Sequence, residues 1–378
     1  MGNEKKSVII VSPSLDAKVN VGGVSSVVNF IIKNNTEVAY RHFQQGKRGD
    51  ERSNAFCRII RILKSYNDWK ILLRSDQESL IHYNMSLDGK SILRDYPFIR
   101  YATKKGRKVV VHIHGGLYLF KKEKPYLIRK VLRRLFSHKE TLFIFLSEKE
   151  KQNIQDEYNP CHIYSLPNVV DLANASNFHR NHDNKPGLQI LYLGRIEANK
   201  GMDYILRACK ILKQRGVFFH LHMAGKEETP GSYIPKFEKE VGKDFFSYEG
   251  VVYGKEKDRL LETCNVFLLP SFYEGLPMSM LEAMSFGQVP VVTAVGSIGE
   301  YVKNGINGII VKKKDETSIV EAITYLSKNK TLMSKIAYQS KKTIFDFFNP
   351  RDYIVQLNEI YFPPPLDKTC DRNRCLHS

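Results

Sequence analysis

The chain of 378 residues lacks any long apolar run, and no stretch approaches the roughly eighteen residues that a membrane-spanning helix needs. Its first apolar segment, VIIVSP at residues 8–13, is short and strand-like, so the N-terminus does not resemble a signal peptide. A myristoylation signal is also missing, because Lys6 stands where the motif after Gly2 needs Ser or Thr. These absences favour a cytoplasmic protein.

Cysteine is scarce, and the six residues are scattered in a way that favours reduced thiols over a disulfide framework. Acidic residues are outnumbered, at 40 against 58 Lys and Arg, which leaves a formal charge of +18. Such an excess predicts an anionic partner or surface and says nothing about the fold. The length indicates two domains, and the apolar fraction of 42% is that of a globular protein.

The most informative stretch is residues 266–300, VFLLPSFYEGLPMSMLEAMSFGQVPVVTAVGSIGE. We expect an apolar strand at Val266–Leu269, then a loop, then a helix with Pro277 in its first turn and Gly287 at its end. A second strand follows at Val289–Thr293. Because ligands bind at the carboxyl ends of strands in an α/β sheet, the loop before the helix is a candidate binding site.

Two carboxylates belong to this unit, Glu274 in the loop and Glu282 in the helix. Between them, the amides near Gly275 and Leu276 are among the unpaired N–H groups of a helix start, which attract a phosphate. Carboxylates accept hydrogen bonds from sugar and ribose hydroxyls. The combination suits a sugar nucleotide, although the bare spacing of the two glutamates would more often mean solvated charges.

This stretch resembles the donor-site signature of retaining glycosyltransferases of the GT-B fold, family 4 type. The matching pieces are FYEGLPMSMLEAMSFGQVPVV, LYLGRIEANKGMDYILRA and HMAG, and the resemblance is strongest over residues 190–311. It implies an α/β protein with two Rossmann-like domains facing a cleft, and a C-terminal helix that crosses back to the N-terminal domain. The expected divisions are an acceptor-binding domain at 1–172, a linker at 173–187, a nucleotide-sugar domain at 188–348, and a crossover helix and tail at 349–378.

The resemblance also implies roles for residues outside that stretch. It places Arg195 and Lys200 on the donor diphosphate, and cations there would neutralise its charge. It places the loop with Gly22 and Gly23 opposite the diphosphate, although a plain turn between strand and helix is the alternative.

A histidine at the end of the strand Lys108–His112 is expected between the domains, near the reacting sugar, and His114 is the better match. His112 lies on the same face of the strand, but no nearby carboxylate or cysteine completes a metal site. A structural role for His114 is the alternative. The predicted catalytic residues are therefore His114 and Glu274, with Glu274 positioning the donor sugar and Glu282 the ribose.

A basic amphipathic helix is predicted within residues 121–139. One half of the helix is apolar, with Leu127, Ile128, Val131, Leu132, Leu135 and Phe136, and the other half carries Arg129, Lys130, Arg133 and Arg134. This pattern is typical of a membrane-surface element. It fits equally well a helix whose apolar half packs on the sheet while its basic half is solvated.

The expected reaction is sugar transfer from a nucleoside diphosphate sugar, with UDP favoured, to a hydroxyl, and the resemblance implies retention and no metal cofactor. The basic helix suggests a lipid-linked glycan acceptor and a peripheral position on the inner face of a membrane, in surface polysaccharide assembly. A GT-B sugar-nucleotide epimerase is one alternative. A non-enzymatic binder of membranes or nucleic acid is another, although no nucleic-acid-binding module is recognisable and no nucleic-acid partner is expected.

Overall fold

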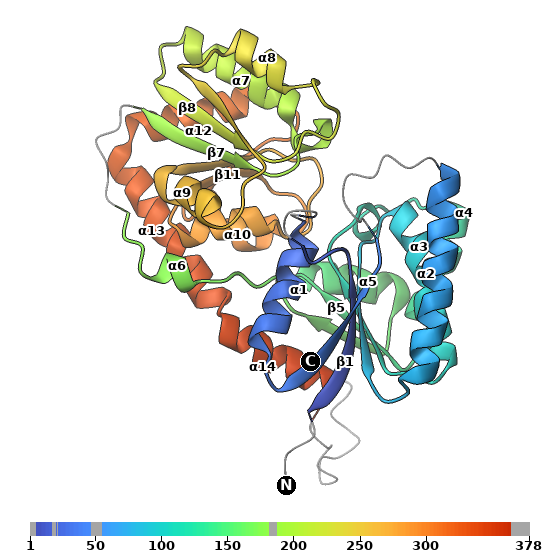
Figure 1. Cartoon of the computed structure of the whole chain (residues 1–378). Coiled ribbons are helices and arrows are strands. Elements are labelled where there is room, and N and C mark those ends of the chain that lie inside the picture. The colour runs from blue at the N-terminus through green and yellow to red at the C-terminus, as the bar shows by residue number, and fades with distance from the viewer. Residues whose placement is uncertain (1–4, 17–19, 21, 47–54, 181–186, 364–378) are drawn as a thin grey trace.

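The computed structural model describes residues 5–16, 20, 22–46, 55–180 and 187–363. The predicted tail from 364 onwards, and residues 181–186 of the predicted linker, lie outside this part of the chain. Two separate sheets of six parallel strands form two lobes (Figure 1). The strand orders are β2-β1-β3-β4-β5-β6 and β12-β11-β10-β7-β8-β9. The predicted α/β architecture with two Rossmann-like domains is confirmed.

The N-terminal domain alternates strands and helices along the chain. Its strands are β1 (Lys6–Ser12), β2 (Val38–Gln44), β3 (Leu80–Met85), β4 (Val109–Ile113), β5 (Thr141–Phe145) and β6 (His162–Ser165). Its helices are α1 (Gly23–Asn34), α2 (Ala55–Ser75), α3 (Gly89–Lys104), η1 (Leu117–Leu119), α4 (Tyr126–Phe136) and α5 (Glu148–Tyr158). Strands β3, β4 and β5 are buried along their whole length, as expected for parallel strands that helices cover on both faces.

The C-terminal domain follows the short helix α6 (Ala173–Ser176). Its strands are β7 (Leu188–Leu193), β8 (Phe219–Ala224), β9 (Phe246–Gly250), β10 (Val266–Leu269), β11 (Val289–Thr293) and β12 (Ile309–Val311). Its helices are η2 (Ala198–Lys200), α7 (Met202–Gln214), α8 (Ile234–Glu240), α9 (Lys255–Thr263), α10 (Met278–Ser285), α11 (Ile298–Tyr301), α12 (Glu316–Lys328) and α13 (Lys330–Phe347). The two strands predicted in residues 266–300 are β10 and β11, so that part of the sequence-based expectation is confirmed.

Helix α14 (Pro350–Tyr361) returns to the N-terminal domain, as predicted (Figure 1). Its buried residues Tyr353, Leu357, Ile360 and Tyr361 join α1 and one face of the first sheet in a single apolar cluster. Helices α2, α3 and α4 bury their apolar sides on the opposite face of that sheet. The last helix of the described chain therefore completes the core of the first domain.

No helix in the described part of the chain combines the length and apolar character that crossing a bilayer requires.

Candidate active site

The loop between β10 and α10 carries Glu274 and is held from behind by the segment after β11. The Ser297 amide donates to the Gly275 carbonyl at 3.0 Å. Gly296 has a φ of +56°, and a Cβ placed on it would lie 2.1 Å from the Glu274 carbonyl oxygen. Only glycine fits this close approach in a left-handed conformation, so the backbone position of Glu274 depends on Gly296.

Lys200 and Glu274 form an ion pair, with 2.6 Å between Nζ and Oε1. Their side chains are only 14% and 11% exposed. The two loops are fixed to each other nearby, because the Phe272 amide donates to the Asn199 carbonyl at 2.9 Å. The structure thus brings together two predicted donor-site residues that are 74 positions apart.

Glu282 pairs with Lys257 at 2.9 Å, and the sequence analysis assigned Lys257 no role. Burial lowers the pKa of Lys257, but Glu282 beside it, together with Asp258 and Asp171, raises the pKa, and the net shift is upward. Lys257 lies in the first turn of α9, where the helix dipole disfavours a cation. That unfavourable position was the one signal in the sequence that Lys257 has a partner elsewhere.

The start of α10 offers free backbone donors. Pro277 is the N-cap and Met278 is the first helical residue, so the proline stands one position earlier than predicted. The amides of Gly275 and Leu276 have no hydrogen-bond partner among the described residues. This arrangement leaves N–H groups available for an anion, in the loop that also carries Glu274.

Gly22 and Gly23 face this helix start from the N-terminal domain. Gly22 is the N-cap of α1, and its amide donates to Asn20 Oδ1 at 3.1 Å. A Cβ placed on Gly23 would lie 3.1 Å from Cγ of Met278. The two helix N-termini therefore approach each other across the domain boundary, and the predicted place of this loop opposite the donor diphosphate remains a prediction.

His114 lies at the same boundary, just after β4. Its Nε2 is 2.7 Å from Asn84 Oδ1, while Asn84 Nδ2 donates to the Val11 carbonyl. Since the amide nitrogen of Asn84 is engaged in that way, its oxygen accepts from Nε2–H, and Nδ1 of His114 is an acceptor. Burial lowers the pKa of His114 to about 4, although a side-chain hydrogen bond with Asn168 acts to raise it. The ring is neutral at physiological pH.

His112 and His82 lie behind His114 inside the domain. The His112 and His114 rings are 4.1 Å apart, and His82 Nε2 is 3.3 Å from His112 Nδ1. Both inner rings are fully buried, and burial depresses the pKa of each. Across the described residues, no three His, Cys, Asp or Glu side chains are grouped so as to hold a metal ion. His112 therefore belongs to the core.

The two domains touch directly beside these groups. A Cβ placed on Gly115 would lie 2.8 Å from the Cα of Gly275, so the two backbones are in contact. Asn168 Nδ2 donates to the Leu276 carbonyl at 2.7 Å, a role that the sequence analysis did not foresee. The segment after His114 thus packs on the segment after Glu274, which puts both predicted catalytic residues at one boundary.

Glu150 makes a second contact between the domains. It is wholly buried, and its carboxylate accepts from Ser297 Oγ at 2.9 Å and from the Leu146 amide at 3.1 Å. Burial raises the pKa of Glu150 to about 7, although the Ser297 hydrogen bond acts in the opposite direction. A carboxyl group with this pKa changes charge near neutrality, at the interface that fixes Ser297.

Arg195 is placed differently from Lys200. Its side chain is 54% exposed and lies 3.3 Å from Glu197 and 3.7 Å from Glu228. No ion pair joins it to Glu274 or Glu282 within the described part of the chain. Its predicted contact with the donor diphosphate remains a prediction.

Helix α4 matches the predicted basic helix. Five of its apolar residues are buried against the sheet, so the packing alternative is correct for that half: Ile128, Val131, Leu132, Leu135 and Phe136. Leu127, which the prediction placed with them, is 54% exposed. The basic half, with Arg129, Lys130, Arg133 and Arg134, is exposed, and its contact with a membrane stays a prediction.

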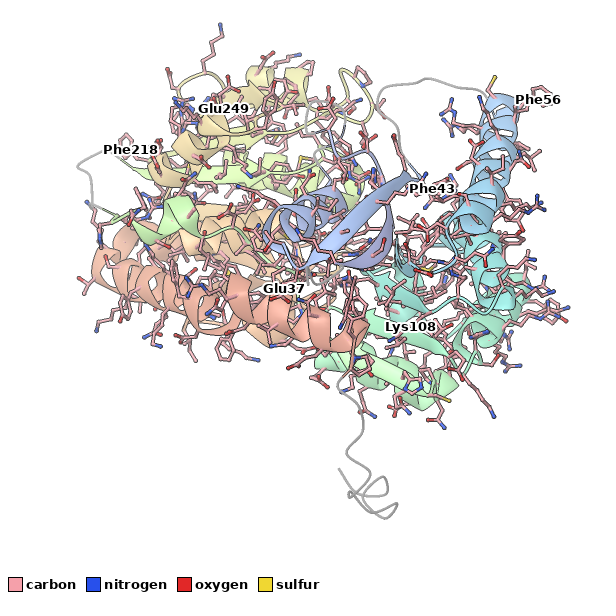
Figure 2. The ribbon with its side chains drawn as sticks, turned by 60° about the horizontal axis from the view of Figure 1, so that its bottom comes forward. Glu37, Phe43, Phe56, Lys108, Phe218 and Glu249 are labelled. Atoms are coloured by element: carbon pink, nitrogen blue, oxygen red, sulfur yellow. The ribbon has the colours of Figure 1, made fainter. Side chains whose placement is uncertain are left out.

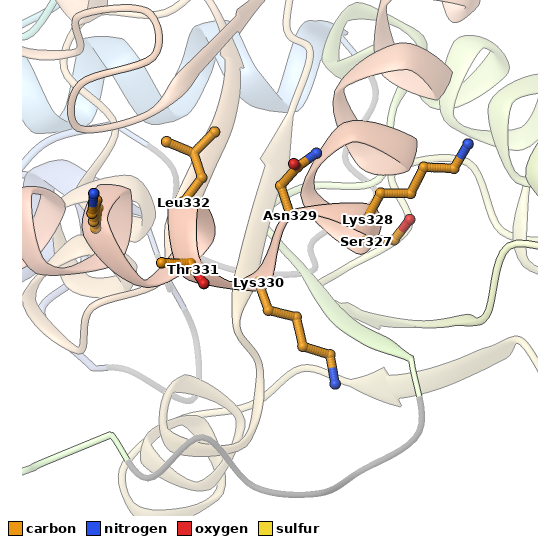
Figure 3. A pocket seen from close by; sticks show the side chains of 7 residues that line it. Ser327, Lys328, Asn329, Lys330, Thr331 and Leu332 are labelled. Carbon is orange, nitrogen blue, oxygen red and sulfur yellow. The ribbon is translucent and has the colours of Figure 1, made fainter.

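An open pocket lies where α12 meets α13, and its lining is polar and basic (Figure 3). Asn329 separates the two helices there, with Lys328 and Lys330 on either side. None of the predicted site residues lines it. The candidate active site is the boundary between the domains.

Comparison with known proteins bears on the family and the fold of the chain. Residues 175–343 match the family described as glycosyl transferases group 1. A Klebsiella pneumoniae protein, described as an uncharacterized 41.2 kDa protein in the cps region, is 24% identical over 79% of this chain and 86% of its own. Escherichia coli UDP-Gal:alpha-D-GlcNAc-diphosphoundecaprenol alpha-1,3-galactosyltransferase is 25% identical over 82% of each chain.

A solved structure shows the same fold over nearly the whole chain. The sucrose-phosphate synthase of Thermosynechococcus elongatus superposes with a TM-score of 0.76 over 94% of this chain and 98% of its own. The identity of 15% limits that likeness to the fold. The shared fold includes both sheets, so the resemblance seen in the sequence extends beyond the matched residues of the second domain.

Proposed function

The protein is a glycosyltransferase with the GT-B fold, and from that premise we propose that it transfers a sugar, with retention, from a UDP-sugar to a hydroxyl of a lipid-linked glycan. The Escherichia coli relative supports both substrates, since its name gives a UDP-galactose donor and a diphosphoundecaprenol acceptor. The cps region named for the Klebsiella relative supports a role in surface polysaccharide assembly.

One arrangement carries the proposal: the ion pairs of Glu274 with Lys200 and of Glu282 with Lys257, both largely buried, accompany the amides before α10 that have no partner among the described residues. A bound diphosphate would sit on those amides and draw Lys200 away from Glu274. Glu274 would then be free to accept hydrogen bonds from the donor sugar, and Glu282 from the ribose. Arg195, exposed on its loop, would reach the diphosphate from the other side.

We propose front-face attack for the chemical step. The bond from the sugar C1 to the diphosphate oxygen breaks while the acceptor oxygen bonds to C1 on the same face. The acceptor proton passes to the departing diphosphate, whose growing negative charge Lys200 and the α10 amides stabilise. His114 Nδ1 accepts a hydrogen bond from a hydroxyl of the reacting sugar. No metal ion takes part in this scheme.

The acceptor side is proposed to meet the inner face of a membrane. Arg129, Lys130, Arg133 and Arg134 on α4 are exposed, and anionic headgroups attract basic residues near the surface by about 1 kcal/mol each. The lipid-linked acceptor and the protein would then share one surface. Nucleic acid has no part in this proposal.

Thermal unfolding with UDP, GDP and ADP in the presence of EDTA tests the donor site. A nucleotide at 100 times its dissociation constant stabilises the folded state by about 2.7 kcal/mol. We expect UDP to raise the melting temperature, and Glu282→Ala to abolish the rise because it removes the ribose contact. Glu238→Ala, a change of an exposed glutamate on α8, is the matched control and should keep the rise.

The outcomes separate the proposal from its rivals. If no nucleotide raised the melting temperature, the donor site would be rejected, and the alternative of a non-enzymatic binding protein would be favoured. UDP binding followed by conversion of a UDP-sugar without any acceptor would favour an epimerase. A requirement for a divalent metal would contradict the metal-free scheme.

A further inference from the structure

The N-terminal end of α2 exposes apolar side chains that the core does not use. Phe56 is 69% exposed, Ile59 57%, Ile60 50% and Leu63 63%. Figure 2 shows Phe56 at the free end of the helix, pointing away from the domain. In the second half of α2, Trp69, Leu72 and Leu73 are buried, and Ile71 is the exposed apolar residue, at 55%. The helix is therefore held by its C-terminal half, while its first turns carry a solvent-facing apolar surface.

The four exposed residues lie on one helix face. Positions 56, 59, 60 and 63 follow the i, i+3, i+4, i+7 spacing, so Phe56, Ile59, Ile60 and Leu63 form a continuous stripe, here called the α2 stripe. Single exposed apolar residues are common on protein surfaces, but a contiguous group marks an interaction site. The α2 stripe thus needs a partner outside the chain's own core.

The surroundings of the α2 stripe carry charge of one sign. Helices α2, α3 and α4 lie side by side in one layer (Figure 1). They hold five, four and four Lys or Arg residues respectively, against two acidic residues, Asp68 and Asp95. Asp95 is fully buried and paired with Arg94 at 2.7 Å. Outwardly, the layer is almost uniformly basic.

We propose that the α2 stripe inserts into the headgroup region of an anionic lipid bilayer, while the basic layer of α2, α3 and α4 rests on the headgroups. Apolar residues on one helix face with basic residues around them are the pattern of interfacial helices. A second copy of the chain fits less well, since a symmetric dimer would press two basic layers together. Nucleic acid would use the charge but leave the four apolar side chains in water.

The inference rests on the proposed lipid-linked acceptor and gives it a docking geometry. Membrane affinity comes from two separable contributions, apolar insertion by α2 and charge attraction by the whole layer. Charge attraction weakens with salt and apolar insertion does not. The α4 residues predicted from the sequence would then add attraction, and α2 would fix the depth and orientation of the N-terminal domain.

Vesicle flotation with the full chain tests the proposal. Vesicles of phosphatidylethanolamine and phosphatidylglycerol should carry the protein, and vesicles of phosphatidylcholine alone should not. The triple change Phe56→Ser, Ile59→Ser and Leu63→Ser should lower partitioning at least about tenfold, because it removes the apolar contribution and leaves all charges. It should also leave the fold intact, since all three residues are exposed.

A matched control removes similar exposed apolar groups elsewhere. Tyr338→Ser, Phe347→Ser and Val355→Ser change residues that are 67%, 67% and 56% exposed on α13 and α14, and this variant should float like the unmodified chain. Equal loss in both variants, or flotation by neither form of the protein, would overturn the proposal. So would a dimer of the unmodified chain that the α2 variant converts to monomer.

Nucleotide binding keeps the two proposals distinguishable. The α2 variant should retain the UDP-induced rise in melting temperature, because α2 shares no residue with the donor site. Flotation without any UDP effect would preserve the membrane surface and reject the donor assignment. A UDP effect without flotation would reject the membrane surface alone.

Discussion

His114 is held uncharged and in one tautomer by its neighbours. The amide oxygen of Asn84 accepts a hydrogen bond from Nε2–H, and burial lowers the pKa of the ring to about 4. A histidine of this kind is a poor general acid or base near neutrality, because its pKa lies far from the working pH. It is suited instead to accepting a hydrogen bond through Nδ1.

Turnover of the UDP-sugar should therefore be independent of His114 titration between pH 6 and pH 8. Asn84→Asp places a carboxylate against Nε2–H, which raises the pKa of His114 by favouring the imidazolium. Protonated His114 cannot accept at Nδ1, so this variant should lose activity as the pH falls toward 6. Activity profiles and the NMR titration of the His114 ring measure both effects.

Asn84→Ala is the control for that experiment. It removes the hydrogen-bond acceptor without adding charge, so activity should fall by a similar factor at every pH. A wild-type profile that follows an ionisation of His114 near pH 7 would contradict the tautomer assignment.

The sequence predicted single residues better than their pairings. Glu274, Glu282 and Lys200 were singled out because they belong to stretches that resemble a known signature. The partner of Glu282 was missed, because Lys257 belongs to a different βα unit. Lys257 and Glu282 come together only because of how the strands are ordered in the sheet. Their separation in the sequence therefore gives no sign that they pair.

Gly296 controls the loop that carries Glu274. In Gly296→Ala, the new Cβ would collide with the Glu274 carbonyl oxygen, in a residue whose φ of +56° already disfavours a side chain. We expect a loss of stability of about 1–3 kcal/mol and a larger loss of UDP-sugar turnover, because Glu274 must shift. Thermal unfolding and activity of the same preparation measure the two losses.

Gly305 provides the matched comparison. Its φ is +74°, and a Cβ placed on it would meet nothing within 4 Å. Gly305→Ala should therefore show the conformational cost alone and keep its activity. Equal loss of activity in both variants would mean that backbone strain, rather than the position of Glu274, is responsible.

Helices were predicted by pattern, and their exposure was less predictable. The amphipathic pattern of α4 correctly indicated a packed face, yet Leu127, which the pattern places on that face, is exposed. In helix α2, the apolar residues Phe56, Ile59, Ile60 and Leu63 of the first half are exposed, whereas Trp69, Leu72 and Leu73 of the second half are buried. A single-helix pattern cannot register such a change of environment.

At the scale of the molecule, Glu150 links stability to pH across the domain boundary. Burial raises its pKa in the folded protein to about 7, above the usual value of 4.5 for a glutamate. The stabilisation from keeping it protonated is fully present below the unfolded pKa and is lost as the pH rises through 7. Between pH 4.5 and pH 8 this loss amounts to at most about 3 kcal/mol.

Glu150→Gln should remove that loss, because the amide stays neutral. We expect the melting temperature of the variant, relative to the unmodified chain, to rise from pH 5 to pH 8. Glu148→Gln changes an exposed glutamate on the same helix and should give a constant difference. A pH-independent difference for Glu150→Gln would show that the carboxyl is already ionised at pH 5.

The two-domain architecture was predictable because it follows from the length, the alternation of strands and helices, and the resemblance. The contacts at the interface between the two domains could not be predicted from the sequence. Ser147 and Glu150 form a local helix cap, in which Ser147 Oγ accepts from the Glu150 amide. The two carboxylate oxygens of Glu150 accept hydrogen bonds from the Leu146 amide and from Ser297 Oγ. The bond to Ser297 depends on the position of the second domain, which the local sequence does not indicate.

Helix α14 has a consequence for how the protein is made. Its residues Tyr353, Leu357 and Tyr361 fill one side of the N-terminal core, yet they are translated after the whole second domain. The first domain therefore leaves the ribosome with an open apolar face and must wait for the final helix before it can close. The C-terminal domain can thus complete its fold before the N-terminal domain, although the N-terminal domain is synthesised first.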